Sequence, residues 1–459
     1  MFDVSGKAIH VIGLGAKGTG RACAAVLSAL GARVTVSDAK TADALAEVTA
    51  QLAQLPVRLL LGADAYRGIE SADLVVPSPG VPLTIEPIQR ARAAGVPVLS
   101  EIELAYRLTD APIVAITGTK GKTTTTTLIH LLLRALGRPA HLGGNIGYPL
   151  IELAVQADAD ALLVAEVSSF QLEAVEEFRP RVAVFTNLHP DHLDRYDGSM
   201  ERYLDAKLNL FRRQTADDVV VVNADRSERA RVEAVTPARA VRVSTERPAP
   251  GGVYCADGWI ISEVQGAAKR VMAVSAIRLK GAHNLANVLQ AVAAVEALGL
   301  PAETVAAAVL SAFRGVPNRL EEVDTLDGVT FYNDSQGTTP AAVEVALRAF
   351  APARPVLIAG GRPKITDFSE LGRIIAERAQ AVILIGEAAD VLETAIRAAA
   401  PDFPIHRAPS LPDAVRQGFA LAKPDGLVLL SPACASFDMF RNMEHRGEVF
   451  RQAVAHLRD

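Results

Sequence analysis

Residues 117–124, TGTKGKTT, constrain the fold more than any other part of this 459-residue sequence. They follow an apolar, β-branched run at 113–117, which predicts a buried strand, and they precede a helix expected from Thr123 to about Leu136. Glycines let backbone N–H groups approach phosphate oxygens, and the helix N-terminus adds positive potential. Lys122 and Thr123 offer a point charge and a Mg²⁺ ligand. We therefore predict a nucleotide-phosphate loop on a parallel α/β sheet.

This loop has the spacing G-x-x-G-K-T, two residues shorter than the common G-x-x-x-x-G-K-[ST]. The shorter spacing argues against a P-loop switch or motor ATPase, which would bind nucleotide without small-molecule chemistry. A glycine-rich turn that carries two solvated lysines is the structural alternative. The agreement of strand, loop and helix favours the phosphate loop.

The same rhythm of strand and helix recurs along the chain and indicates α/β architecture throughout. Because 459 residues are too many for one core, the length alone predicts two or three domains. The strand and helix pattern falls into three segments, so we expect three α/β domains, each with its own core. They are a Rossmann-like domain at 1–100, a central P-loop ATPase-like parallel sheet at 101–315 and a Rossmann-like domain at 316–459. The broken, polar stretch 237–273 predicts a small antiparallel excursion. Further strands are expected at 8–14, 33–37, 73–76, 162–166, 182–186, 219–222, 329–332, 356–359, 381–385 and 427–430, with helices at 20–30 and 283–298.

Charge and cysteine content exclude several classes of protein. With 47 basic and 52 acidic residues the net charge is −5, which disfavours nucleic-acid binding by bulk electrostatics. The cysteines Cys23, Cys255 and Cys434 are isolated, so we expect neither a disulfide framework nor a zinc site. The short apolar run near the N-terminus ends in glycines, unlike a signal peptide, and no apolar run is long enough to span a bilayer. We expect a cytoplasmic protein.

A second glycine motif, GLGAKG at residues 13–18, follows the first expected strand, and Asp38 closes the next one. This is the form of a dinucleotide-binding fingerprint, with an acidic residue where a ribose would be bound. The motif suits NAD, or another nucleotide diphosphate on the same helix N-terminus. A purely structural tight turn is the third interpretation.

Polar residues also follow two strands of the central segment. Glu166 ends the strand at 162–166, on the edge where the phosphate loop emerges, and is well placed as a Mg²⁺ ligand; a solvated glutamate is the alternative. The run NLHPDHLDRY at 187–196 holds two histidines and two aspartates within six positions. His192 is favoured as a metal or substrate ligand, whereas His189 could be a ligand or a core residue. Lys207, taken alone, is expected to be a surface lysine on a helix.

Four further motifs lie at expected strand ends or element boundaries of the third segment, where α/β sites collect. Each could equally be a helix cap or a turn. They are NRLE at 318–321, YNDS at 332–335, GGRPK at 360–364 and SPACASF at 431–437.

In this order the motifs resemble those of the Mur ligases, ATP-dependent amide-forming enzymes of peptidoglycan synthesis, over the whole chain. The shared segments are TGTKGKTTT, GGNIG at 143–147, EVSSFQLE at 166–173, NLHPDHLDRY with Lys207 downstream, GAHNLAN at 281–287, NRLEE, NDS and SPACASFDMF. Within the family, SSFQLE together with DHLDRY is similar to the member that adds D-glutamate to UDP-N-acetylmuramoyl-L-alanine. The siblings that add other amino acids, and folylpolyglutamate synthetase, differ at these places.

The resemblance implies a role for each matching residue. The uridine diphosphate end would contact Gly15, Ala16, Lys17, Asp38, Lys40 and Gly80. ATP would contact Gly118, Thr119, Lys120, Gly121, Lys122, Thr123, Thr124, Asn284, Arg319 and Asp334. One Mg²⁺ would bind Thr123 and Glu166, and a second would bind His192 and a carbamylated Lys207, with Mn²⁺ as a possible substitute. The muramoyl substrate would meet Asn145, Ser168 and His192, and D-glutamate would meet Thr338, Lys364, Ser436 and Phe437. Lys122, Glu166, His192 and Lys207 would form the catalytic group.

The resemblance also implies the reaction. Transfer of the γ-phosphoryl group of ATP to a carboxylate would give an acyl phosphate, which the amine of D-glutamate would attack. We expect a monomer that binds these small molecules and neither nucleic acid nor membrane. Two rival interpretations remain, a sibling ligase with another amino acid and an NAD-dependent oxidoreductase, which would leave the phosphate loop and EVSSFQLE unused.

The chain departs from the family pattern at two positions. Where the family usually has lysine in N-D-S-K, this chain has Gln336, and Asn318 stands where relatives often have histidine. The first departure removes a cationic contact near the reacting groups.

Overall fold

The computed structural model describes residues 2–14, 18–279, 281–363 and 367–458. By its contacts the chain forms two compact units, each described by itself. The first comprises Met1–Ala276 with Ala282–Leu310, and the second comprises Ile277–Gly281 with Ser311–Asp459.

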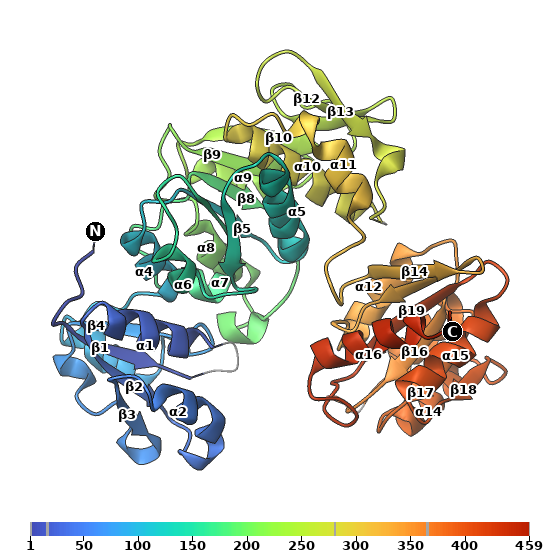
Figure 1. The fold of residues 1–459 in the computed structure, drawn as a ribbon, viewed down its shortest axis with the longest axis horizontal. Helices are drawn as coiled ribbons and strands as arrows, with labels where there is room; N and C mark the ends of the chain where they lie inside the picture. Colours follow the sequence, from blue (N-terminus) through green and yellow to red (C-terminus); the bar gives the residue numbers. More distant parts are fainter. Residues whose placement is uncertain (1, 15–17, 280, 364–366, 459) are drawn as a thin grey trace. The chain divides into compact units, whose positions relative to one another are not determined.

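The first unit begins with a four-stranded parallel sheet in the order β3-β2-β1-β4, drawn in blue in Figure 1. Its strands are β1 (Ala8–Ile12), β2 (Arg33–Asp38), β3 (Arg58–Leu61) and β4 (Leu74–Pro77), and its helices are α1 (Thr19–Ala29), α2 (Ala46–Leu52) and α3 (Glu86–Ala93). β1 ends at Ile12, two residues before the expected end, because Gly13 takes a left-handed φ of 88° and turns the chain.

The same unit continues into a nine-stranded sheet in the order β13-β12-β11-β10-β9-β8-β5-β7-β6. Strands β5 to β10 are parallel to their neighbours, and β11 is parallel to β10. β11, β12 and β13 pair antiparallel and form the expected excursion. Runs such as VVVV in β9 are buried throughout, as expected of strands covered on both faces. The strands are β5 (Ile113–Thr117), β6 (Ala140–Gly144), β7 (Leu162–Glu166), β8 (Val182–Phe185), β9 (Val219–Asn223), β10 (Arg239–Ser244), β11 (Val253–Ala256), β12 (Trp259–Ser262) and β13 (Lys269–Ala273).

Helices pack on this sheet, and the order of its strands brings three carboxyl-terminal ends together. α5 (Lys122–Ala135) packs against α10 (Ala282–Ala297), which also contacts β8, β9 and β10. The other helices are α4 (Glu101–Leu108), α6 (Leu150–Ala154), α7 (Ser169–Leu172), α8 (Met200–Leu208), α9 (Arg229–Ala234) and α11 (Ala306–Ala312). Because β5 lies between β7 and β8, the segments that follow these three strands meet at one edge of the sheet.

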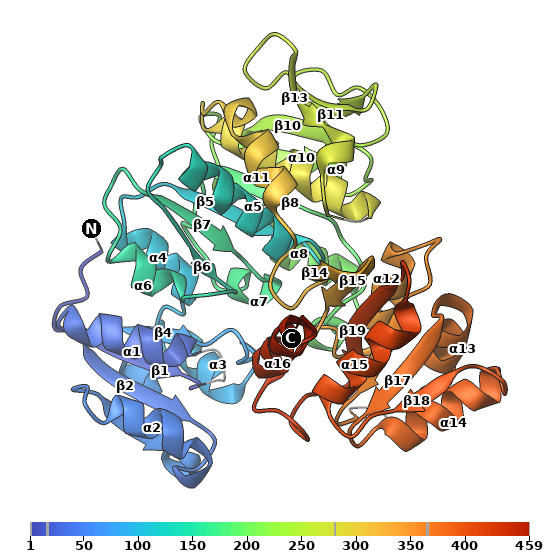
Figure 2. The ribbon, with the colours of Figure 1, turned by 45° about the vertical axis from the view of Figure 1, so that its right-hand side comes forward.

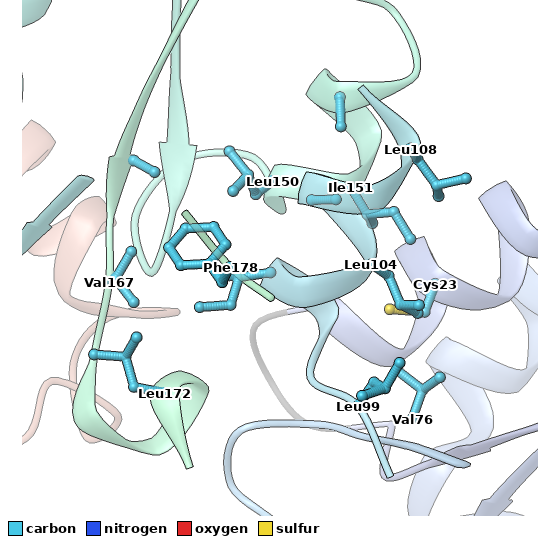
Figure 3. Close-up of a cluster of buried hydrophobic side chains, with 14 of the residues drawn as sticks. Cys23, Val76, Leu99, Leu104, Leu108, Leu150, Ile151, Val167, Leu172 and Phe178 are labelled. Atoms are coloured by element: carbon cyan, nitrogen blue, oxygen red, sulfur yellow. The ribbon is translucent and has the colours of Figure 1, made fainter. Parts of the chain in front are cut away.

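The two sheets of the first unit share a hydrophobic core, contrary to the expectation of a separate core for each domain. Cys23 of α1 lies in the same buried cluster as Leu104 of α4, Ile151 of α6 and Phe178, which lies between α7 and β8 (Figure 3). α6 contacts both α1 and α4. The central domain therefore holds the first sheet through packed helices, an arrangement that short strand and helix patterns do not encode.

The second unit is a six-stranded sheet in the order β14-β15-β19-β16-β17-β18, parallel except for β14. α12, α13 and α14 pack on one face, and α15 and α16 pack on the other (Figure 2). The insertion of β19 between β15 and β16 brings their carboxyl ends together. The elements are β14 (Glu321–Leu326), β15 (Val329–Asn333), α12 (Pro340–Ala349), β16 (Val356–Gly360), α13 (Ser369–Arg378), β17 (Ala381–Ile385), α14 (Ala389–Ala399), β18 (Ile405–Arg407), α15 (Leu411–Ala422), β19 (Leu427–Ala433) and α16 (Met443–Ala455).

The expected α/β class with its parallel-rich sheets is confirmed, and most expected strands differ from those observed by one or two residues. The sequence did not predict β3, β6, β14 or β18, which are short or partly exposed. None of the helices in the described part of the chain combines the length and apolar character that crossing a bilayer requires.

Candidate active site

The loop between β5 and α5 adopts a conformation that requires glycine at two positions. Gly118 has a φ of 141° and Gly121 a φ of 81°. A Cβ on Gly118 would lie 2.0 Å from the Thr186 hydroxyl oxygen, and one on Gly121 would lie 2.3 Å from Oδ1 of Asn287. Such approaches are far shorter than van der Waals contact, so the loop is packed tightly between β8 and α10.

Backbone and side-chain bonds from the segment after β8 hold the loop open as a cradle. Asn187 accepts hydrogen bonds from the Thr119 and Lys120 amides, at its carbonyl oxygen and at Oδ1, both 2.9 Å long. Lys122 begins α5 and curls back, so that Nζ donates to the carbonyl oxygens of Gly118 (3.1 Å) and Thr119 (2.9 Å). Its charge therefore lies over the helix N-terminus, where an anion is favoured.

Glu166 lies where the sequence predicts it, at the end of β7 beside the phosphate loop. Its side chain is 2% exposed. One carboxylate oxygen accepts a hydrogen bond from the Thr123 hydroxyl and the other accepts one from the side-chain amide of Asn145, both 2.7 Å long. A buried carboxylate and a hydroxyl at the mouth of a phosphate loop are the hard oxygen ligands that Mg²⁺ takes together with phosphates and water.

The surface position expected for Lys207 from its own sequence context is wrong. Its side chain is 1% exposed, its Nζ donates to the Gly118 carbonyl oxygen at 2.7 Å, and the ammonium lies 4.3 Å from the centre of the Tyr203 ring. Burial, and then the positive charge of Lys122, lower the pKa of Lys207 well below its usual 10.5. The structure thus places a buried amine beside the phosphate loop, and the environment of this amine disfavours its protonated form.

His192 contributes its side chain to the site, and His189 contributes its backbone. His192 has a left-handed φ of 51°, and its ring packs edge-on against Phe170 with centroids 5.1 Å apart. The Asp191 carboxylate lies 3.8 Å from the ring nitrogen of His192 and 3.6 Å from the ammonium of Lys120. The side chain of His189 is exposed, while its amide donates to the Thr119 hydroxyl at 3.0 Å.

Several of these groups line a pocket of about 360 Å³ within the first unit. Gly80, Lys122, Asn145, Ser168, His192 and Lys207, all expected in the site, line it. The remaining lining residues are not among those predicted from the sequence; they are Thr19, Ser78, Pro79, Gly144, Ser169, Phe170, Gln171, Asp191 and Tyr203. Phe170 and Asp191 lie inside quoted motifs, so their neighbours signalled them. Thr19, Ser78 and Tyr203 carried no signal of their own.

Arg195 links the two sheets beside Phe170, one of the pocket-lining residues. Its guanidinium donates to both carboxylate oxygens of Glu173 (3.1 and 2.6 Å) and to the Val81 carbonyl oxygen (3.1 Å) of the segment after β4. It also lies 4.9 Å from the centre of the Phe170 ring. One side chain therefore links EVSSFQLE, DHLDRY and the segment that carries Gly80.

In the first sheet, Asp38 folds the chain around the ends of β1 and β2. Its carboxylate accepts hydrogen bonds from the amides of Leu14 (2.9 Å) and Lys40 (3.0 Å). The Ser78 hydroxyl donates to the Gly13 carbonyl oxygen at 2.6 Å. Both carboxylate oxygens of Asp38 are thus engaged by the backbone, in the place where a dinucleotide fold would bind ribose. The predicted ligands Gly15, Ala16 and Lys17 lie outside the described residues.

The second unit gathers its motifs at the carboxyl ends of β15, β19 and β16. Asp334 accepts a hydrogen bond from the Ser431 hydroxyl (2.7 Å) and one from the Leu320 amide (3.3 Å), and burial raises its pKa to about 7. Arg319 donates from Nε to Oε1 of Gln336 at 2.7 Å. Ser436 is buried and Phe437 is 63% exposed. Lys364 lies outside the described residues.

Arg446 is a buried cation that the sequence analysis missed. It has 0% exposure and donates to the Ser335 hydroxyl (3.0 Å) and to the carbonyl oxygens of Ser335 (2.9 Å) and Cys434 (3.2 Å). Burial lowers its pKa to about 10. It therefore ties the NDS motif to the SPACAS motif, although an arginine within the polar segment MEHRGE of a helix gives no sign of burial.

Comparisons with known proteins agree along the whole chain. Family models match in three consecutive parts: "Mur ligase MurD-like, N-terminal domain" at residues 7–100, "Mur ligase middle domain" at 116–295 and "Mur ligase, glutamate ligase domain" at 318–434. A protein of Geotalea uraniireducens (strain Rf4), 43% identical over 100% of this chain and 99% of its own length, is named UDP-N-acetylmuramoylalanine--D-glutamate ligase. This chain belongs to the Mur ligase family.

Solved structures of Mur ligases share the fold. The UDP-N-acetylmuramate-alanine ligase of Thermotoga maritima is 19% identical, with a TM-score of 0.57 over 98% of this chain and 100% of its own. The MurF ligase of the same organism, solved in complex with ADP, is 15% identical, with a TM-score of 0.57 over 93% of this chain and 96% of its own. Family membership removes the oxidoreductase and motor interpretations and confirms the resemblance stated from the motifs.

Proposed function

We infer that this chain is an ATP-dependent ligase that adds D-glutamate to UDP-N-acetylmuramoyl-L-alanine in peptidoglycan synthesis. The observation that carries this conclusion is the pocket of the first unit. There Lys122 of the phosphate loop, the buried amine of Lys207, His192 and the segment 78–80 that follows β4 of the first sheet converge. Relatives that share the full length of this chain carry the name of this reaction.

The chemistry requires activation of a carboxylate, because a carboxylate at neutral pH does not acylate amines. Phosphoryl transfer from ATP to the L-alanyl carboxylate gives an acyl phosphate and ADP. The uncharged amine of D-glutamate then attacks the acyl carbon, and the tetrahedral intermediate expels phosphate. Little covalent chemistry falls to the protein, so its contribution is positioning and electrostatic stabilisation.

We propose that Lys122 and the cradle residues Gly118, Thr119, Lys120, Gly121, Thr123 and Thr124 bind the ATP phosphates. From the family resemblance we also propose that Asn284, Arg319 and Asp334 contact the nucleotide. Asn284 is buried near the start of α10, where it accepts a hydrogen bond from Asn287 at 3.1 Å. The positive φ values of Gly118 and Gly121 and the lack of room for a Cβ at either residue support the cradle, since only glycine fits both positions.

Two positions suit divalent metal ions. Thr123 and Glu166, already joined through a 2.7 Å hydrogen bond, offer the oxygen donors for one Mg²⁺. His192 and Lys207 would hold the second, either ion being replaceable by Mn²⁺. Bound metal would neutralise charge that builds up between the anionic reactants. In the protein itself, Asn145 orients Glu166, and Lys122 places a cation beside the transferred phosphoryl group.

Lys207 can serve an anionic role only as a carbamate, formed when its uncharged amine adds to CO₂. Its burial and the neighbouring charge of Lys122 support this proposal, because both favour the uncharged amine. The carbamate would reverse an unfavourable contact, placing a negative group next to the Lys122 ammonium.

The remaining substrate contacts follow the domain pattern 1–100, 101–315 and 316–459. We propose that the first domain binds the uridine diphosphate end through Gly15, Ala16, Lys17, Asp38, Lys40 and Gly80. Asn145, Ser168 and His192 then meet the muramoyl part in the pocket. D-Glutamate binds the second unit through Thr338, Lys364, Ser436 and Phe437.

The deciding experiment measures phosphate release from MgATP with UDP-N-acetylmuramoyl-L-alanine and one amine at a time. The panel is D-glutamate, L-glutamate, L-alanine, glycine, lysine and diaminopimelate. Release with D-glutamate alone establishes reaction, substrate and stereochemistry together. Release with another amine moves the chain to a sibling activity, and no release with any amine refutes the proposal. Size-exclusion chromatography coupled to light scattering tests the expected monomer, and fractionation tests the cytoplasmic location.

A further inference from the structure

The two positions at which this chain departs from the family pattern lie on either side of one arginine. The Arg319 side chain donates from Nε to the side-chain oxygen of Gln336 at 2.7 Å. The backbone amide of Gln336 donates to the Asn318 carbonyl oxygen at 2.9 Å. Among the residues that the structure describes, Gln336 alone accepts a hydrogen bond from the Arg319 side chain. Both departures therefore concern the immediate surroundings of Arg319.

The backbone on both sides of Arg319 is held in an unusual conformation. Asn318 has a φ of 64° and Leu320 a φ of 43°, left-handed values that non-glycine residues rarely adopt. Three bonds maintain this shape. The Asn318 amide donates to the Glu321 carboxylate at 2.8 Å, the Arg319 amide to the Val316 carbonyl oxygen at 2.9 Å, and the Leu320 amide to Asp334 at 3.3 Å. Such strain collects where a side chain must be presented in one direction.

The Asn318 side chain anchors the same turn in the interior of the unit. Its Oδ1 accepts hydrogen bonds from the Asn333 amide (3.0 Å) and from Arg451 (3.3 Å). A Cβ on Gly447 would lie 1.7 Å from this oxygen, so α16 passes too close for a larger side chain at that position. A compact amide fits the space between β15 and α16.

Hydrogen-bonding capacity and charge explain why glutamine suits position 336 better than lysine. A guanidinium only donates hydrogen bonds, so the partner of Nε at 2.7 Å must offer an acceptor, which the amide oxygen of glutamine does. A lysine at 336 offers no acceptor and would bring a second positive charge next to Arg319. In the described part of the chain the Arg319 side chain donates through Nε only. This leaves the N–H groups of its two terminal nitrogens for a planar, two-pronged contact with phosphate oxygens.

We propose that Gln336 is a positioning residue that orients the Arg319 guanidinium for the nucleotide phosphates. It replaces the family's cationic contact with a hydrogen-bond acceptor. The inference rests on the nucleotide role proposed above for Arg319. It differs from a direct role of residue 336 in binding D-glutamate or the acyl phosphate, which a lysine at this position would suggest.

The test uses the full-length enzyme and the variants Gln336→Met, Gln336→Glu and Gln336→Lys. Methionine keeps the length but removes the acceptor, glutamate keeps an acceptor, and lysine adds a cation. Gln417→Met is the matched control, because Gln417 lies on α15 and its side chain donates to the backbone carbonyl oxygen of Arg407. Steady-state rates are measured while ATP, the UDP-sugar and D-glutamate are varied separately, and thermal unfolding of each variant is recorded.

We expect Gln336→Met to raise KM for ATP about tenfold and Gln336→Lys to raise it further. Gln336→Glu should stay within about threefold of the wild type, as should all KM values for the other two substrates. In a double-mutant cycle with Arg319→Lys, the combined loss should be clearly smaller than the product of the single losses, because both changes break one contact.

Three results would overturn the inference. They are an unchanged KM for ATP in Gln336→Met, a change confined to KM for D-glutamate, or independent losses in the cycle. Calorimetric titration with a nonhydrolysable ATP analogue and Mg²⁺ separates this inference from the proposed reaction. If the wild type binds the analogue but forms no amide, the proposed function fails, while weaker analogue binding by Gln336→Met would still support the role of Gln336.

Discussion

Replacing Lys207 by alanine tests the least expected feature of the site. The amine is 1% exposed and donates to the Gly118 carbonyl oxygen at 2.7 Å, an oxygen that also accepts a bond from Lys122 at 3.1 Å. The two nitrogens therefore lie at most about 6 Å apart, the sum of these two distances. Two ammonium groups so close together are unfavourable unless one of them loses its charge.

The size of the effect follows from this distance. At about 6 Å and an effective dielectric constant of about 20, two unit charges interact with about 3 kcal/mol. As an ammonium Lys207 repels Lys122 by that amount, and as a carbamate it attracts Lys122 by a similar amount. Lys207→Ala forfeits the attraction, and about 3 kcal/mol corresponds to roughly a hundredfold in rate. We therefore expect kcat/KM to fall by about 10²- to 10³-fold.

The assay is phosphate release with D-glutamate, with and without added short carboxylic acids. A small carboxylate that enters the space left by the side chain should restore part of the activity of Lys207→Ala, but not that of a Lys122→Ala variant. Labelled ¹³CO₂ should give a carbamate signal in the wild type that Lys207→Ala lacks. Lys423→Ala, at an exposed lysine paired with Asp327, is the matched control. Activity of Lys207→Ala within fivefold of the wild type, or no carbamate signal in the wild type, would refute the reasoning.

The same reasoning gives a pH dependence. The pKa of Lys207 in the folded state lies below the unfolded value of 10.5, so the unfolded state binds more protons between these two pH values. Without CO₂, stability should therefore rise with pH through that window. The uncharged amine also becomes more abundant as pH rises, so activation of CO₂-depleted enzyme by added CO₂ should be faster at pH 9 than at pH 7.

Other side chains give simpler tests. Gly121→Ala, with its φ of 81° and a Cβ 2.3 Å from a neighbouring amide oxygen, should raise KM for ATP at least tenfold, whereas Gly198→Ala, with a φ of 75° in open space, should not. The pKa of Asp334 rises to about 7 on folding, so the folded state binds more protons than the unfolded state between about pH 4 and pH 7. Stability should therefore fall as pH rises through this range, and Asp334→Asn should remove this pH dependence of thermal unfolding. Arg195→Met, which breaks the 2.6 Å ion pair with Glu173, should raise KM for the UDP-sugar about tenfold and leave KM for ATP unchanged.

The sequence was most informative where local pattern and chemistry coincide. The phosphate loop combined a buried strand, glycines and a helix start, so its position and conformation could be predicted together. Glu166 was recognisable because it ends an apolar strand on the same edge of the sheet. In both cases the relevant partners follow neighbouring parallel strands, and the topology rule for such sheets places them.

Lys207 and Arg446 show where local patterns fail. Both are charged residues on helices with polar neighbours, and such residues are almost always exposed. Their burial depends on segments far away in the chain, the Gly118 loop for Lys207 and Ser335 with Cys434 for Arg446. Only the motif resemblance singled out Lys207, and nothing in the sequence singled out Arg446.

Gln336 illustrates a third relation between sequence and structure. Compared with the family pattern, the glutamine at position 336 removes a positive charge near the reacting groups. In the structure the same residue gains a partner, since its side-chain oxygen accepts a hydrogen bond from Nε of Arg319 at 2.7 Å, in a turn that Asn318 anchors. The two departures are 18 positions apart in the sequence and concern a single side chain. A comparison of motifs treats each of these two substitutions as an independent change. In the structure both affect the orientation of the Arg319 side chain, and this shared effect determines whether nucleotide binding is weakened or maintained by different contacts.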